Sequence, residues 1–294
     1  MLSDLEHILT SQDMVGESPV WSVNEQALYW VDILGCRFHR YHPASGTWDT
    51  YTTTVSIGAI ALRASGGLVM ATGQGFATYD LTTRRFAFLA NPLAALPDMR
   101  FNDGNVDCQG RFWAGTVSNL PERQGLLLGT LYRLEPNGSM HVMDTGYALI
   151  NGIGWSPDTT HMYIVDSMRK GIYCYDFDAA SGAIAHRQMF LDTSAEMGVP
   201  DGLTVDQEGA LWVAFWDGWK IVNYDPSGRR VAHIDLPVQC PSSCAFGGRY
   251  VDELYITSAW EELNESQRTS QPFAGDLFRL KMERRGLPQP LFLG

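Results

Sequence analysis

The feature that most constrains the fold is a segment that recurs six times along the chain. Each copy opens with a short apolar run, turns at residues rich in Asp, Gly or Pro, and continues through further apolar and aromatic runs. Neighbouring copies start 40 to 50 residues apart. The residues at the equivalent opening position are Glu17, Ile57, Asn102, Asn151, Asp201 and Ser242.

A repeat of this length with four strand-like runs is typical of a β-propeller blade. No amphipathic pattern of helical period separates the runs, which disfavours an α/β barrel, and a β-sandwich would show no such repeat. The sequence therefore predicts an all-β, six-bladed propeller with four-stranded antiparallel blades, formed as one domain by residues 1–294. The run from Leu5 to Leu9 predicts a strand that joins the last blade, so that N- and C-terminal segments pair and close the ring.

Charge narrows the possible partners. The chain has 33 acidic and 21 basic residues, a formal net charge of −12, and no stripe of Lys or Arg. Such a surface repels phosphate groups, so we expect no binding to nucleic acid or to an anionic membrane. A small molecule is the expected partner, and the chain is expected to be a monomer or a weak homo-oligomer.

The N-terminal segment and the cysteines favour a cytoplasmic location. Met1 to Thr10 lacks the basic and apolar parts of a secretory signal. No run approaches the roughly 18 apolar residues of a membrane-spanning helix. The five cysteines are scattered, and we expect them to be free, buried or half-buried thiols. Such thiols are typical of a reducing compartment.

The six opening residues predict a metal site at one mouth of the central channel. In a propeller the innermost strand of each blade lines the channel, so these residues form a ring. Two carboxylates and two amides converging there are costly unless a cation lies among them. Any single Asn-Gly or Asp-Gly is more often a turn, but four polar residues share one repeat phase. Oxygen donors without His or Cys suit Ca²⁺, Mg²⁺ or Mn²⁺ better than a structural zinc ion.

Several motifs also resemble the SMP-30/gluconolactonase/luciferin-regenerating enzyme family. They are spread over most of the chain in the family's order and are specific in combination. The motifs are G-E-S-P-V-W at 16–21, R-F-N-D-G at 100–104, G-R-F-W-A-G-T at 110–116, N-G-I-G-W-S-P-D at 151–158 and P-D-G-L at 200–203. The resemblance implies a six-bladed propeller that hydrolyses sugar lactones, such as glucono-, xylono- or arabinonolactone, to aldonic acids with a divalent metal ion.

Position by position, the resemblance implies that Glu17, Asn151 and Asp201 bind the metal, whose identity stays open among Ca, Mn, Zn, Mg and Fe. It implies that Asn102 lies beside the metal and that Arg100 binds substrate. The metal would polarise the lactone carbonyl and activate water. Asp201 is the favoured general base, with Glu17 as the second choice.

Three further residues are predicted to contact substrate because the loops after the second strands open at the same mouth. They are Asn119, Trp216 and Trp260. Aromatic faces suit a sugar ring, although these tryptophans could equally pack at the rim. Animal members of the family carry acidic residues where this chain has Val117 to Leu120, and Asn119 is a possible replacement. The polar insert at 261–273 is expected to lie over the mouth.

Two other functions fit the same sequence. One is a phosphotriesterase-like hydrolase, and the other is a non-enzymatic, calcium-binding regulatory propeller with a purely structural metal. A serine hydrolase is disfavoured because no G-x-S-x-G is present. A histidine base is disfavoured because none of the seven His residues falls at a ring position.

Overall fold

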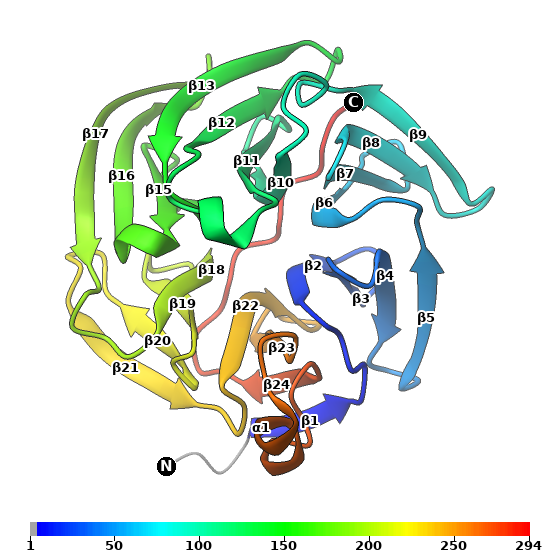
Figure 1. Cartoon of the computed structure of the whole chain (residues 1–294), viewed down its shortest axis with the longest axis vertical. Coiled ribbons are helices and arrows are strands. Elements are labelled where there is room, and N and C mark those ends of the chain that lie inside the picture. The colour runs from blue at the N-terminus through cyan, green and yellow to red at the C-terminus, as the bar shows by residue number, and fades with distance from the viewer. Residues whose placement is uncertain (1–4) are drawn as a thin grey trace.

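The computed structural model describes residues 5–294 and consists of six four-stranded antiparallel sheets arranged around a central channel (Figure 1). The all-β, six-bladed propeller predicted from the repeat is therefore confirmed. In each blade the first strand of the repeat lies innermost and later strands follow outward. The opening residues of all six repeats lie on innermost strands.

Blade one contains β2 (Gly16–Ser22), β3 (Ala27–Asp32), β4 (Arg37–His42) and β5 (Thr47–Thr52). Blade two contains β6 (Ile57–Leu62), β7 (Leu68–Thr72), β8 (Gly75–Asp80) and β9 (Arg85–Ala90). Blade three contains β10 (Met99–Val106), β11 (Phe112–Ser118), β12 (Gly129–Leu134) and β13 (Met140–Tyr147). Blade four contains β14 (Ile150–Trp155), β15 (His161–Asp166), β16 (Gly171–Asp178) and β17 (Ala183–Asp192).

Blade five contains β18 (Val199–Val205), β19 (Leu211–Trp216), β20 (Lys220–Tyr224) and β21 (Arg230–Asp235). Blade six contains β22 (Cys240–Gly247), β23 (Glu253–Ala259), β24 (Leu277–Lys281) and β1 (Leu5–Leu9). The short helices are η1 (Pro121–Arg123), η2 (Ser167–Arg169) and α1 (Glu265–Ser270).

The ring closes as predicted. β1 pairs antiparallel with β24, with Leu5 opposite Leu280 and His7 opposite Phe278. The structure also settles the order that the sequence left open, because β1 is the outermost strand of blade six. This pairing covers the edge of β24, which would otherwise be open to association with another chain.

The turn between the first and second strands explains the Asp and Gly residues of the repeat. In blade three, Asp107 Oδ1 accepts from the backbone N–H groups of Gln109 and Arg111, and its Oδ2 accepts from the Trp113 indole at 2.8 Å. In blade five, Asp206 accepts from the Trp212 indole at 3.0 Å in the same way. In these two blades one carboxylate thus holds the tight turn and accepts the hydrogen bond of a buried tryptophan.

All six innermost strands carry a β-bulge at the same phase. The pairing register shifts between Glu17 and Val20, Ile57 and Ala59, Phe101 and Gly104, Ile150 and Ile153, Pro200 and Leu203, and Pro241 and Ser243. A bulge adds an unpaired residue and turns side chains away from the regular alternation. Asn102, Asn151, Asp201 and Ser242 lie inside their bulges, whereas Glu17 and Ile57 are the paired residues directly before theirs. The six predicted openings therefore coincide to within one residue.

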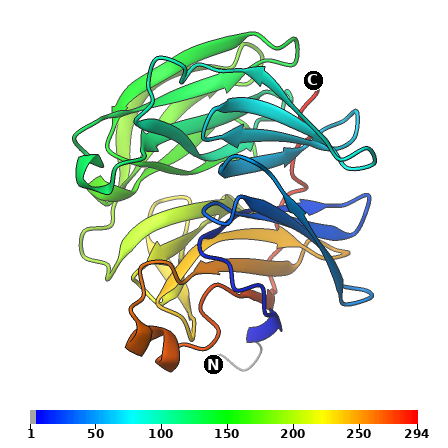
Figure 2. The same cartoon turned by 45° about the vertical axis from the view of Figure 1, so that its right-hand side comes forward.

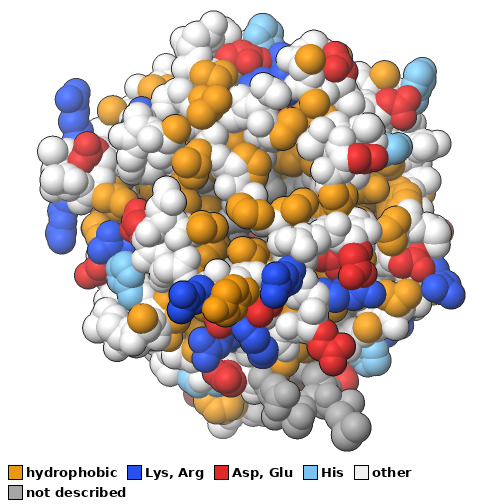
Figure 3. Space-filling model, turned by 180° about the vertical axis from the view of Figure 1, so that it is seen from behind, with side chains coloured by type: hydrophobic (Ala, Val, Ile, Leu, Met, Phe, Trp, Pro, Cys, Tyr) orange, Lys and Arg blue, Asp and Glu red, His pale blue; other side chains and the backbone are white. Residues whose placement is uncertain are grey.

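The C-terminal segment, residues 282–294 after β24, crosses the face of the propeller opposite to η1 and α1 (Figures 1 and 2). Gln289 Oε1 accepts from the backbone N–H of Trp21 in blade one. Phe292 N donates to Leu62 O in blade two, and Leu293 N donates to Gly110 O in blade three. Seen from behind, hydrophobic side chains extend across the middle of this face (Figure 3). The segment therefore ties three blades together behind the channel.

The cysteines and the absence of a membrane-spanning run were also predicted from the sequence. All five cysteines are free, but Cys108 is exposed rather than buried, because it lies in the turn after β10. Within residues 5–294, no helix has the length and apolar character needed to cross a membrane. The prediction for Met1 to Thr10 falls partly on residues 1–4, which lie outside the described residues.

Candidate metal centre and active site

A cavity of about 420 Å³ lies at one mouth of the channel. Innermost strands supply its floor, and the loops between second and third strands supply its walls. Seven of the eight predicted site residues line it, namely Glu17, Arg100, Asn102, Asn119, Asn151, Asp201 and Trp216. Further lining residues include Leu34, Ser118, Gln124, Ser167, Met168, Glu261 and Glu262. The topology thus brings together residues that are far apart in the chain, such as Glu17 and Glu262.

The two carboxylates on the floor are buried close to one another. Glu17 and Asp201 are each 5% exposed. Burial raises the pKa of Glu17 well above its usual range, and the charges of Asp201 and Asp103 raise it further, while Ser18 N–H and Arg100 lower it. Burial likewise raises the pKa of Asp201, with a second contribution from Asp103. Without a cation, this site is therefore costly to ionise.

A chain of hydrogen bonds orients the amide groups of the site. Arg100 donates to Asn102 Oδ1 at 2.7 Å, and Asn102 Nδ2 donates to Asn151 Oδ1 at 2.9 Å. Asn151 Nδ2 then donates to Ser167 Oγ at 3.0 Å. Asn151 Oδ1 accepts one of these bonds and keeps a second lone pair. A hydrogen bond from Asn151 also lowers the pKa of Asp201, so the amide group lies next to that carboxylate. Burial lowers the pKa of Arg100 to about 10, and Glu17 opposes that shift.

A third carboxylate, Asp103, lies next to the floor on the channel side. It is 8% exposed and lines a smaller cavity deeper in the channel with Ser18, Cys244 and Gln289. Burial raises the pKa of Asp103 to about 7, although its Oδ1 accepts from Gly104 N at 2.6 Å. The negative charge that converges on this mouth therefore exceeds what Arg100 can balance.

The donor set fits a hard divalent cation. Among residues 5–294 no group of three His, Cys, Asp or Glu side chains is arranged to hold a metal ion. The predicted set differs in kind, since it combines two buried carboxylates with the amide oxygen of Asn151. Ca²⁺, Mg²⁺ and Mn²⁺ prefer oxygen donors of this type. A divalent cation would also balance the negative charge of the two carboxylates.

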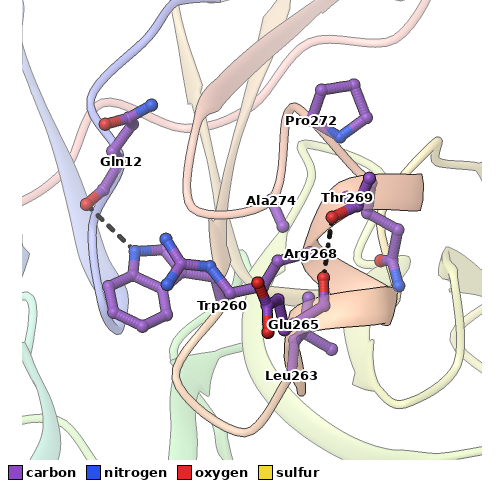
Figure 4. Close-up of a pocket in the computed structure, with 9 residues that line it drawn as sticks. Gln12, Trp260, Leu263, Glu265, Arg268, Thr269, Pro272 and Ala274 are labelled. Atoms are coloured by element: carbon purple, nitrogen blue, oxygen red, sulfur yellow. Dashed lines mark hydrogen bonds between the residues drawn. The ribbon is translucent and has the colours of Figure 1, made fainter.

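The predicted rim residues divide into two groups. Trp216 and Asn119 line the cavity, and the Trp216 indole donates to Glu262 Oε2 at 3.0 Å. Trp260 lies outside it and lines a neighbouring cavity with residues of α1 (Figure 4). Its indole donates to Gln12 O at 3.1 Å. Of the insert 261–273, Glu261 and Glu262 line the central cavity, whereas α1 lines the neighbouring one.

Sequence reasoning missed several residues of the site. Ser167 follows β15 and orients Asn151, but nothing in its local sequence marks that role. Glu262 contacts Trp216 across 46 positions of sequence. Asp103 could have been found, because it directly follows Asn102 and its side chain falls in the same bulge.

Comparison with known proteins now adds a second line of evidence. A family model described as the SMP-30/gluconolactonase/LRE-like region matches residues 15–260, which contain the entire predicted metal site. The chain belongs to this family.

Named relatives in the SMP-30/gluconolactonase/LRE-like family match almost the full chain. A 6-deoxy-6-sulfogluconolactonase from Pseudomonas putida is 34% identical over 295 residues and covers 100% of both chains. A pentonolactonase from Haloferax volcanii is 34% identical and covers 94% of this chain and 93% of its own. The crystal structure of a calcium-binding regucalcin from Agrobacterium tumefaciens superposes with a TM-score of 0.94 at 27% identity, covering 99% and 97%.

Proposed function

We propose that this protein hydrolyses a sugar lactone to the corresponding aldonic acid with a divalent metal ion as cofactor. Glucono-, xylono- and arabinonolactone are the substrates that we propose first. The observation that carries the proposal is the convergence of Glu17, Asn151 and Asp201 on the floor of an open cavity. Relatives in the family are named as lactonases for a sulfonated gluconolactone and for pentonolactones, which supports the reaction class.

The proposed metal ligands are Glu17, Asn151 and Asp201. Two carboxylates offset the charge of a divalent cation, and the cavity above them leaves space for substrate and water. When bound, the ion would polarise the lactone carbonyl and lower the pKa of a nearby water. Calcium is supported by the regucalcin relative, and Mn, Zn, Mg and Fe stay open because each can accept such oxygen ligands.

We assign the proton transfers to the chain's own residues. Water oxygen bonds to the lactone carbonyl carbon, and Asp201 takes the proton that the water loses. The bond between the carbonyl carbon and the ring oxygen then breaks, and Asp201 returns the proton to that oxygen. Asp201 is assigned this role because its carboxylate lines the cavity and can accept a proton from a water held there.

The remaining residues bind and orient the lactone. Arg100 is placed to donate to the carbonyl oxygen as negative charge develops there. Asn102 holds the Arg100 guanidinium and contacts Asn151, so it couples the substrate site to the proposed metal site. Asn119 and Trp216 offer a polar group and an aromatic face on the walls.

The test is a panel of aldonolactones assayed with protein stripped of metal by a chelator and then supplied with single metal ions. We expect hydrolysis above the buffer rate only when a divalent ion is present. The same preparations should be assayed on a phosphotriester, because the alternative hydrolase would favour that substrate. A lactone rate equal to that of buffer with every metal would refute the proposal.

The alternative of a non-enzymatic propeller with a purely structural metal is disfavoured, because the cavity beside the proposed ligands is open and a structural ion is normally enclosed by protein. The substrate contact of Trp260 stays a prediction. So do the single domain at 1–294, the cytoplasmic location and the monomeric or weakly oligomeric state.

A further inference from the structure

We propose that Glu261 and Glu262 form an acidic rim that selects neutral, hydroxyl-rich lactones and rejects lactones carrying an anionic group. This inference rests on the proposed function and names the substrate class for the same site. The name acidic rim is used below for these two residues only.

The acidic rim is part of the active-site cavity. Both residues line it, together with Glu17 and Asp201 on the floor. Glu262 also lies within electrostatic range of Asp201, since its charge contributes to raising the pKa of that carboxyl. The rim follows directly after β23, so it stands at the wall of the cavity while the catalytic carboxylates lie on innermost strands.

The loop that carries the acidic rim is held from both sides. The backbone N–H groups of Trp260 and Glu261 both donate to Met14 O at 3.1 Å. Glu262 accepts from the Trp216 indole at 3.0 Å, which ties the rim to blade five. The Glu262 carboxylate is therefore held in place before substrate binds, and the backbone of Glu261 is fixed beside it.

The helix behind the rim reinforces this placement. The Arg268 guanidinium stacks over the Trp260 ring at 3.7 Å, and the Trp260 indole N–H donates to Gln12 O (Figure 4). Asn264 and Gln267 form a reciprocal capping box at the start of α1. These contacts hold Trp260 in a structural position next to the rim.

The charges of the cavity are arranged in two layers. On the floor, Glu17 and Asp201 face Arg100 and the cation of the proposed function, which leaves that layer near neutral or slightly positive. On the wall, the acidic rim adds two negative charges, and Arg100 is the one basic side chain among the described residues that line the cavity. A lactone whose carbonyl points to the floor must place its far end near the rim.

The acidic rim then determines which group the lactone can carry at the end away from its carbonyl. A carboxylate can accept several hydrogen bonds, so the bond from Trp216 leaves Glu262 able to accept from a substrate hydroxyl. Charge-assisted bonds of this kind are stronger than neutral ones. A phosphate, sulfonate or carboxylate at the same place would instead meet two like charges.

The experiment compares two lactones that differ in one group, glucono-δ-lactone and 6-phosphoglucono-δ-lactone. Values of kcat/KM are measured with metal-loaded protein after subtraction of the buffer rate. We expect the wild type to prefer the neutral lactone by at least about tenfold. The double variant Glu261→Gln/Glu262→Gln should reduce this preference by about tenfold, and high salt should reduce it in the wild type.

Glu265→Gln is the matched control, because it removes one negative charge from α1 outside the central cavity. It should leave the ratio of the two kcat/KM values unchanged. Hydrolysis of neither lactone would overturn the proposed function and this inference together. Hydrolysis of both lactones with a ratio near one in the wild type, or a ratio that the double variant does not change, would overturn this inference alone.

Discussion

Replacing Asp103 by Asn should stabilise the metal-free protein. Asp103 is buried beside Glu17 and Asp201, so its charged form is unfavourable in the folded state. Asparagine has nearly the same shape and keeps an oxygen that can accept from Gly104 N. The substitution therefore removes the charge without removing the contact, and the usual loss of stability in a core substitution should be reversed.

The size of the effect follows from the pKa of Asp103, which burial raises from 3.8 to about 7. A shift of one pKa unit corresponds to about 1.36 kcal/mol, so the full cost of the charged form is about 4 kcal/mol. The neighbouring carboxylates titrate together with Asp103 and share this cost. We therefore expect Asp103→Asn to raise the free energy of unfolding by about 2 to 4 kcal/mol at pH 7.5.

The sign of the pH dependence follows from the same shift. Below about pH 4 both the folded and the unfolded chain hold the proton, so the variant gains almost nothing. Between about pH 4 and pH 7 the unfolded chain releases the proton first, and the wild type loses stability as the pH rises. The advantage of the variant should therefore grow across this window and level off above it.

Urea unfolding of both proteins after chelation, at pH 4 and at pH 7.5, measures this difference. Asp235→Asn is a suitable control, because Asp235 is an exposed residue at the end of β21 and should change stability by less than about 0.5 kcal/mol. Adding a divalent cation should shrink the advantage of Asp103→Asn, since a nearby cation favours the charged form. An Asp103→Asn protein that is no more stable than wild type at pH 7.5, or gains equally at pH 4, would refute this reasoning.

Three further predictions concern other parts of the molecule. Ser167→Ala removes the acceptor that orients Asn151, so calorimetric titration should show metal affinity reduced about tenfold or more; unchanged affinity would contradict the role of this contact. Phe292→Ala leaves a cavity in the core between blades two and three, so urea unfolding should show that the free energy of unfolding falls by about 3–5 kcal/mol. A decrease below about 1 kcal/mol would contradict the role of the C-terminal segment in holding the blades together. Arg100→Lys should lower kcat/KM for lactones by at least about tenfold with metal affinity retained, because Lys lacks the planar fork; wild-type kinetics would argue against substrate contact.

The sequence was sufficient for the fold because the fold is repetitive. Five of the six repeats place an Asp or Gly in the turn between the first and second strands, and every repeat places an apolar run on the same strand. The position of each strand can therefore be read from several copies at once. The ring residues followed from the repeat, and the structure places Asn151 and Asp201 inside a bulge and Glu17 directly before one, with all three lining the cavity at the mouth. Strand pairing in the last blade was also predictable, although the order of β1 and β24 was not.

The parts that could not be predicted depend on contacts between segments without a repeated pattern. Trp216 ends the second strand of blade five and Trp260 follows the second strand of blade six, yet only Trp216 lines the central cavity, because Trp260 is held by Gln12 and Arg268. The partner of Trp216 is Glu262, which lies in the long connection between β23 and β24. Such pairs are set by loop geometry, which local propensity does not determine.

The central claim is that Glu17, Asn151 and Asp201 hold a divalent cation at the floor of the cavity. The most direct test is the anomalous difference map of a crystal soaked in Mn²⁺. We expect a peak bonded to carboxylate oxygens of Glu17 and Asp201 and to the amide oxygen of Asn151, and we expect Glu17→Gln to remove both the peak and metal-dependent lactone hydrolysis. A peak elsewhere in the molecule, or full activity in the Glu17→Gln variant, would contradict the account.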